Sequence, residues 1–188
     1  MESAEPERVV RPEGVVRPED VAWGEERRRD VTWTDPMPPL ASLRAMPGLD
    51  FLQGMVDGVI PRPPIASTLG FEIVSVAPGT AEFRLEPQEF HFNPLGLVHG
   101  GVLCTLLDTV VGCAVHTTLE AGWGYTSIDL NVTYLRPVTL KTGMLTAVGT
   151  QTKGGRRVSF ASGEIRDAAG ALIATGTSSL LMFEPGAG

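Results

Sequence analysis

The feature that most constrains the fold is the run from Val102 to Val115, which is apolar at most positions and carries a single charged residue, Asp108. In a helix, this composition leaves almost no polar face. A helix that is apolar on most sides has to be buried on most sides. The sequence therefore predicts a long core helix over residues 100–116, and the rest of the chain has to surround it.

Two glycines, Gly100 and Gly101, stand at the predicted start of this helix. Free backbone N–H groups at a helix start, together with the helix dipole, favour negative charge on a nearby oxygen. Asp108 lies about 12 Å further along the helix axis, on nearly the same face. An oxyanion-stabilising helix start and a carboxylate on one face would suit acyl transfer.

A narrow strip of small and polar residues follows the same face of the helix: Gly101, Thr105, Asp108, Gly112 and His116. One interpretation is purely structural, with Thr105 and Gly112 allowing close packing and Asp108 paired with a buried donor. The other is functional, because a buried carboxylate is costly unless it is paired or hydrogen-bonded. The glycine pair in register with Asp108 favours the functional interpretation.

The 188 residues are 43% hydrophobic and carry a net charge of −7, which is enough for one substantial core and argues against a general nucleic-acid binder. The first residues lack a signal-peptide pattern, and no run is long enough to cross a bilayer. We expect a soluble, cytoplasmic protein.

Cys104 and Cys113 are nine residues apart on one predicted helix and cannot bridge each other. The three scattered histidines predict no metal site.

Composition divides the chain into three parts. Residues 1–40 are rich in Pro, Glu and Arg and predict a flexible extension, although Trp23 and Trp33 could dock on the domain or on a neighbouring subunit. Residues 41–66 predict a short amphipathic helix over 49–59, followed by a stiff proline-rich connector at 61–64. Residues 67–184 hold the main domain.

Six segments of this domain have strand character: 71–76, 81–85, 127–134, 143–151, 157–165 and 172–183. Residues 127–134 alternate almost perfectly between polar and apolar, which is typical of a strand with one buried face. Turn residues separate the others, including 78–79, 153–155 and 167–170. We predict an α+β fold in which a curved antiparallel sheet of about five to six strands wraps around one long helix.

Asn93, His99-Gly100-Gly101, Asp108 and the segment from Ser127 to Pro137 resemble the hotdog-fold acyl-CoA thioesterases of the PaaI type, named after phenylacetic acid degradation. The resemblance covers about residues 48–184, and the order and spacing of the motifs make it specific. It implies a hotdog fold and an obligate homodimer, often a homotetramer, with active sites at the subunit interface. It also implies acyl-CoA as substrate, with coenzyme A as part of that substrate and no separate cofactor.

The resemblance also implies roles for single residues. Asp108 matches the catalytic carboxylate, and the N–H of Gly100 matches the group that polarises the thioester carbonyl, with Gly101 beside it as a substrate contact. His99 and Asn93 match residues that orient the thioester or the attacking water, although His99 could instead only pack at the helix start.

Ser127 matches a hydroxyl supplied near the acid by the opposite subunit. His91 and His116 match no functional position, and we interpret both as structural.

Basic residues recur at strand ends and a hairpin tip of this acidic chain: Arg136, Lys141, Lys153, Arg156 and Arg157. They could be solvated strand ends, or they could bind the phosphates of coenzyme A. The resemblance favours the second interpretation, because the family binds its nucleotide on this side.

The leading hypothesis is an enzyme that hydrolyses an aromatic or short-to-medium-chain acyl-CoA without a metal or redox cofactor. Asp108 would act as a general base on water or as a nucleophile, and the sequence leaves both routes open. The alternative is a non-catalytic acyl-CoA-binding hotdog module. A carboxylate in register with Gly100 argues against it, because a sensor needs no acid at the reacting carbon. A hotdog dehydratase is disfavoured, because its His-and-acid signature is absent.

Overall fold

The computed structural model describes residues 14 and 16–184. The chain divides into two compact units, residues 1–30 and residues 31–188. The described part of the first unit contains one short 3-10 helix, η1 (Pro18–Asp20). All the elements discussed below belong to the second unit.

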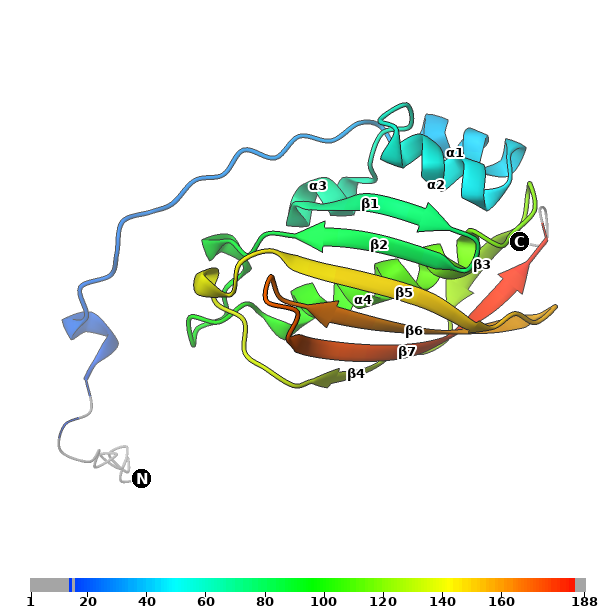
Figure 1. Cartoon of the computed structure of the whole chain (residues 1–188). Helices are drawn as coiled ribbons and strands as arrows, with labels where there is room; N and C mark the ends of the chain where they lie inside the picture. Colours follow the sequence, from blue (N-terminus) through cyan, green and yellow to red (C-terminus); the bar gives the residue numbers. More distant parts are fainter. Residues whose placement is uncertain (1–13, 15, 185–188) are drawn as a thin grey trace, which may run out of the picture. The chain divides into compact units, whose positions relative to one another are not determined.

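A seven-stranded antiparallel sheet curves around the long helix α4 (Gly100–His116), as Figure 1 shows. The main path of the sheet has the order β1-β2-β5-β6-β7-β3, and β4 also pairs with β7. The strands are β1 (Phe71–Ala77), β2 (Thr80–Leu85), β3 (Gly124–Ser127), β4 (Asn131–Tyr134), β5 (Leu145–Lys153), β6 (Val158–Arg166) and β7 (Leu172–Phe183). This arrangement confirms the predicted α+β hotdog fold, with one strand more than expected.

The additional strand arises because residues 127–134, predicted as one strand, form parts of two. β3 and β4 both pair with β7, and the chain leaves the ladder between them. Asp129 sits at this interruption: its carbonyl accepts from the Ser178 hydroxyl at 2.7 Å, and its carboxylate accepts from the Ser179 N–H at 3.1 Å. Polar side chains thus replace ladder hydrogen bonds at a point where the alternating pattern alone predicts an unbroken strand.

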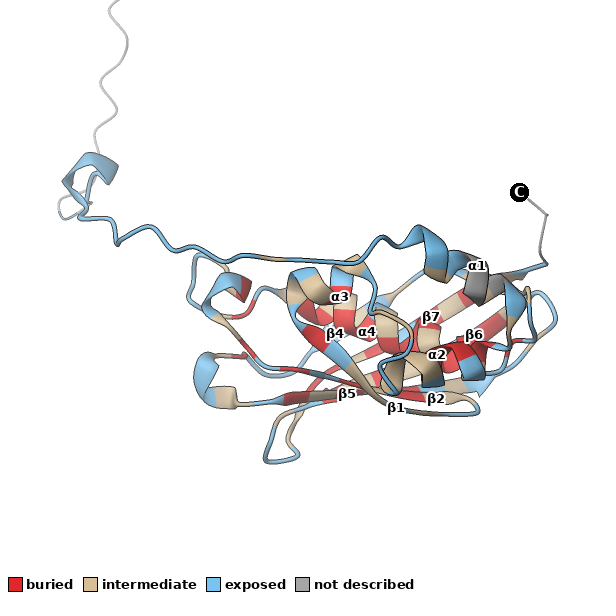
Figure 2. Cartoon of the chain, turned by 90° about the horizontal axis from the view of Figure 1, so that it is seen from above, coloured by how far each residue is buried: buried red, intermediate tan, exposed pale blue. Residues whose placement is uncertain are grey.

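The core lies between α4 and the concave face of the sheet, where Figure 2 shows the buried residues gathered. Three glycines let the helix approach the sheet: Gly149, Gly163 and Gly176. A Cβ atom at Gly149 would lie only 2.1 Å from the carbonyl oxygen of Val110, so any side chain there would push the helix away from the sheet. Fully buried residues of α4 fill the contact: Leu106, Leu107, Val110, Val111, Ala114 and Val115.

Three short helices precede the sheet: α1 (Met37–Ala45), α2 (Gly48–Val56) and α3 (Pro64–Leu69). The prediction of α2 is confirmed, whereas α1 and α3 were not expected. Both carry proline in the first turn, a position where proline favours a helix, so the predicted extension over 1–40 and the predicted connector at 61–64 each run into the first turn of a helix. The expected boundaries at residues 40 and 66 accordingly fall inside α1 and α3. Within the described ranges, no helix has the length and apolarity that a bilayer crossing requires.

Candidate active site

The start of α4 is capped by His99. This residue has an extended backbone (φ −60°, ψ 134°), and its Nδ1 accepts the N–H of Gly101 at 2.8 Å. Because Nδ1 accepts, the ring proton of the neutral imidazole is on Nε2, which leaves His99 with a donor on its other side. The cap also occupies the N–H of Gly101, and the role of Gly101 as a substrate contact stays a prediction. A Cβ at Gly101 would come within 2.9 Å of Nδ1, which explains the glycine.

The N–H of Gly100 remains free: no group in the described part of the chain accepts a hydrogen bond from it. The carbonyl of Gly100 accepts from the Tyr134 hydroxyl at 3.0 Å, and Cys104 Sγ lies 2.8 Å from that same hydroxyl. Partial desolvation and the hydrogen bond with Cys104 raise the pKa of the half-exposed Tyr134 to about 12, so the hydroxyl keeps the proton that it donates. Tyr134 thus fixes the first turn while the Gly100 N–H, at the positive end of the helix dipole, can stabilise an oxyanion.

Asn93 lies in a tight loop that leads into the helix start. Its side-chain oxygen accepts the N–H groups of Leu95 at 2.9 Å and Leu97 at 3.2 Å. Residues 91–93 run antiparallel to residues 97–99, with the His99 N–H bonded to the His91 carbonyl at 2.7 Å. The loop therefore holds Asn93 near the helix start, and its amide NH₂ has no acceptor among the described residues.

Asp108 lies on the exposed side of α4 in the single chain, and not in the core as the apolar run suggested. Its carboxylate accepts the Ser127 hydroxyl at 2.8 Å, from the end of β3 of the same chain. The expectation that Ser127 reaches the acid from the opposite subunit is therefore wrong. The pairing of Ser127 with Leu180 on β7 places the hydroxyl beside the helix.

Asp108 also acts electrostatically on the groups behind it. Burial raises the pKa of the Cys113 thiol to about 12, and the negative charge of Asp108 adds to the effect. The pKa of Tyr125 is raised well above its usual value by burial and by the charges of Cys113 and Asp108. Cys113 therefore stays protonated at neutral pH, and it is unsuited to act as a nucleophile.

Gly100 and Asp108 do not meet in one chain. Eight residues on a straight helix correspond to about 12 Å along its axis. An oxyanion donor has to lie about 3 Å from the carbonyl oxygen, and a base has to reach the same carbonyl directly or through one water. The sequence-predicted residues therefore form two half-sites: Asn93, His99 and Gly100 at the helix start, and Asp108 with Ser127 two turns further on.

The basic residues also separate. Arg136 and Lys141 line an open depression of about 730 Å³ together with Thr139 and Asp167. Lys153, Arg156 and Arg157 lie at the β5–β6 hairpin, at the other end of β5. The nine residues of β5 span about 26 Å, so one chain does not hold these cations as the single cluster that their sequence proximity suggested.

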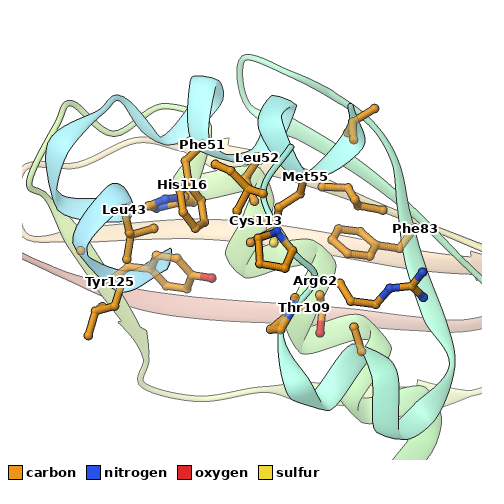
Figure 3. Close-up of a pocket in the computed structure, with 18 of the residues that line it drawn as sticks. Leu43, Phe51, Leu52, Met55, Arg62, Phe83, Thr109, Cys113, His116 and Tyr125 are labelled. Carbon is orange, nitrogen blue, oxygen red and sulfur yellow. The ribbon is translucent and has the colours of Figure 1, made fainter. Parts of the chain in front are cut away.

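A cavity of about 1030 Å³ (Figure 3) reaches Thr109, the residue that follows Asp108 on α4, although Asp108 and Ser127 do not themselves line it. Its wall is mostly aliphatic and aromatic, with side chains from α1, α2, β1, β2 and the loop before β3. Thr109, Cys113 and His116 contribute to it from α4. The wall includes residues of α2, the amphipathic helix that the sequence predicts, whereas no local pattern marks several other members of the lining: Leu40, Leu43, Phe71, Phe83, Trp123 and Tyr125.

His116 is the one buried polar side chain of this cavity wall in the described ranges. Its ring packs edge-on against Phe51, with centroids 6.1 Å apart, and lies 5.7 Å from the Tyr125 ring. Neither ring nitrogen has a hydrogen-bond partner within residues 14 and 16–184. Burial lowers the pKa of His116 to about 4, so the imidazole is neutral at physiological pH.

His91 is structural, in agreement with the sequence interpretation. Its Nδ1 accepts the Gln88 N–H at 3.0 Å, and its Nε2 donates to the Leu69 carbonyl at 2.8 Å. These bonds tie the end of α3 to the loop before the helix start. Across the part of the chain that the structure describes, no three His, Cys, Asp or Glu side chains gather into a set that could hold a metal ion.

Comparison with known proteins agrees with this geometry. The sequence pattern of the thioesterase superfamily matches residues 95–174, which include Gly100, Asp108 and Ser127. Acyl-coenzyme A thioesterase 13 of Homo sapiens is 34% identical over 105 residues, covering 55% of this chain and 74% of that protein.

Solved structures extend the comparison to the fold. A phenylacetic acid degradation-related protein from Ralstonia eutropha is 33% identical, with a TM-score of 0.63 over 69% of this chain and 98% of that one. The PaaI protein of E. coli, at 21% identity, shares the fold with a TM-score of 0.64 over 71% of this chain and 94% of its own. The chain belongs to the thioesterase superfamily, within its hotdog acyl-CoA thioesterases of the PaaI type.

Proposed function

We propose that this protein hydrolyses the thioester of an aromatic or short-to-medium-chain acyl-CoA, giving the free acid and coenzyme A. The observation that carries the proposal is the pair of half-sites on α4. One offers the free Gly100 N–H, and the other offers Asp108 held by the Ser127 hydroxyl. Together they supply an oxyanion donor and a carboxylate, which are the two groups that thioester hydrolysis requires.

A complete site needs the Gly100 of one chain and the Asp108 of another, because about 12 Å of helix separates them within a chain. We therefore propose a homodimer, alone or as half of a homotetramer. In a two-fold symmetric dimer every contact across the interface occurs twice, so the two α4 helices would form two equivalent sites.

The reaction follows from the groups present. Water, or Asp108 itself, attacks the carbonyl carbon, and the negative charge that develops on the carbonyl oxygen is stabilised by the Gly100 N–H. When water attacks, Asp108 takes its proton; when Asp108 attacks, a mixed anhydride forms and water then hydrolyses it. In both routes the C–S bond breaks, and coenzyme A leaves as a thiolate that takes up a proton. The Ser127 hydroxyl orients the carboxylate, and His99 Nε2–H is a donor at the helix start.

The cavity beside Asp108 suits the acyl group, because its wall is predominantly apolar and starts with Thr109, the next residue on α4. The nucleotide end of coenzyme A would then lie toward the helix start of the other chain. Arg136 and Lys141 lie at that end of the sheet, where Arg84 and Arg166 are already paired with Glu82 and Glu164, and we propose that Arg136 and Lys141 contact its phosphates. Lys153, Arg156 and Arg157 lie at the opposite end.

The test is a panel of acyl-CoA thioesters with detection of the free thiol, applied to the parent protein and to Asp108→Asn. The asparagine keeps the shape of the side chain and can still pair with Ser127, but it cannot accept the proton or form the anhydride. We expect hydrolysis by the parent and a loss on the order of 10²-fold or more in the variant. Binding of acyl-CoA without hydrolysis by the parent would instead identify a non-catalytic acyl-CoA-binding module. Activity of Asp108→Asn within a few-fold of the parent would refute the role of the acid.

A further inference from the structure

Helix α1 contributes two leucines, Leu40 and Leu43, to the wall of the cavity beside Asp108. The apolar residues of this helix that the structure describes are not buried in the core. Met37 is 63% exposed and Leu40 is 36% exposed, and Leu43 is only partly buried. A nine-residue helix has little stability of its own in water. Its position therefore depends on its contacts with α2 and on the apolar cavity that it borders.

Leu43 lies at the part of the cavity that is remote from the catalytic acid. The cavity follows α4 from Thr109 to His116, which corresponds to about 10 Å of helix. Figure 3 draws Leu43 on the side where Tyr125 and His116 come together, away from Thr109. An acyl group whose carbonyl lies at Asp108 therefore reaches α1 only with its distal atoms.

α1 also precedes the part of the chain that matches the thioesterase superfamily pattern. The motif resemblance begins at about residue 48, and the superfamily pattern begins at residue 95. The Ralstonia eutropha relative is matched along 98% of its length by 69% of this chain, so nearly a third of this chain has no counterpart in it. The leucines of α1 thus extend the pocket beyond the elements that carry the shared site.

We propose that α1 is a specificity element, in which Leu40 and Leu43 pack against the distal part of a medium-length or aromatic acyl group. The proposal rests on the proposed thioesterase function and deepens it. Apolar contacts made by the far end of the acyl group are the same before and during the reaction. They lower KM for acyl groups that reach α1 and leave kcat nearly unchanged. Short acyl groups end before this wall and gain nothing from it.

The test compares kcat/KM for octanoyl-CoA with kcat/KM for propionyl-CoA in three proteins: the parent, Leu40→Ala/Leu43→Ala and the control Met37→Ala. Met37 is on the same helix but does not line the cavity. We expect the octanoyl-to-propionyl ratio to fall about tenfold in the double variant, through KM, because several methylene contacts are lost. The Met37→Ala ratio should equal that of the parent. An unchanged ratio in the double variant would overturn the proposal.

Two further measurements distinguish a failure of the α1 proposal from misfolding of the variants and from a failure of the proposed thioesterase function. Leu43→Trp fills the cavity instead of enlarging it, and it should also lower the ratio, by excluding the longer acyl group. If the parent releases no thiol from any acyl-CoA, the proposed function fails. Calorimetric binding of octanoate and propionate to the same proteins then tests α1 by itself. Weaker octanoate binding in the double variant supports the specificity element, and equal binding refutes it.

Discussion

A mixture of two inactive variants should recover activity if each catalytic site is built from two chains. The first variant is Gly100→Pro, which removes the N–H proposed as the oxyanion donor. Gly100 is the first residue of α4, a position where proline is favoured, and His99 has the extended backbone that a following proline requires. The second variant is Asp108→Asn. Each variant alone should lose activity on the order of 10²-fold or more.

The recovery can be worked out from the helix geometry. About 12 Å of α4 separates the two residues, so in the proposed dimer each site would take its residue 100 from one chain and its residue 108 from the other. When equal amounts of the two variant chains assemble at random, a site receives Gly100 with a probability of one half and Asp108 with the same probability. About a quarter of the sites are then intact, in a dimer or in a tetramer made of such dimers.

The assay is thiol release from a good acyl-CoA substrate after co-expression of the two chains, with each variant expressed alone as reference. We expect about a quarter of the parent's activity per chain. Gly100→Ala is the matched control, because it keeps the N–H while its methyl group would lie 3.0 Å from the Tyr134 ring. Tyr134 is 49% exposed and can shift, so alanine should cost much less than proline. A mixture no more active than its two components would refute the two-chain site.

Two further predictions concern single features of the fold. His116→Leu should flatten the pH dependence of stability. Burial holds the pKa of His116 at about 4, below its usual 6.5, so the unfolded chain binds the proton more readily than the folded chain does. In the parent, the free energy of unfolding therefore falls by up to about 3 kcal/mol as the pH drops from about 6.5 to about 4. Urea unfolding over this range checks the slope, and an equally steep slope in the variant would contradict the assignment. Arg136→Glu/Lys141→Glu should raise KM for acyl-CoA with little change in kcat, and the increase should shrink with added salt. Arg156→Glu/Arg157→Glu should raise KM less. A larger increase in KM for Arg156→Glu/Arg157→Glu would instead place the phosphate site at the hairpin.

The sequence predicts the elements whose signal is local. The apolar run of α4, the strand character of β5–β7 and the glycines at the helix start each depend on neighbouring residues, and each is present in the structure. The exposure of Asp108 could not be predicted, because an apolar run does not reveal which side of a helix faces outward. The separation of Arg136 from Arg157 was missed for a related reason: a whole strand, β5, lies between them in the chain.

The site itself was predicted in part. The motif positions single out Asp108 and Ser127 as candidates, and the pairing of β3 with β7 brings the two side chains together within one chain. The cavity is assembled from residues as distant as Leu43, Phe83 and Tyr125, and no spacing in the sequence connects them.

The position of β7 bears on when the candidate catalytic residues come together during folding. Within the described residues, β3 and β4 find their hydrogen-bonded neighbour only in β7, which follows every other strand in the chain. Ser178 bonds to Asp129 across 49 residues of sequence. During synthesis, the segment with Ser127 therefore has no strand to join until residues 172–183 have left the ribosome. Non-local pairings of this kind form slowly, so the acid should acquire its hydroxyl partner late in folding, after the helix that carries it.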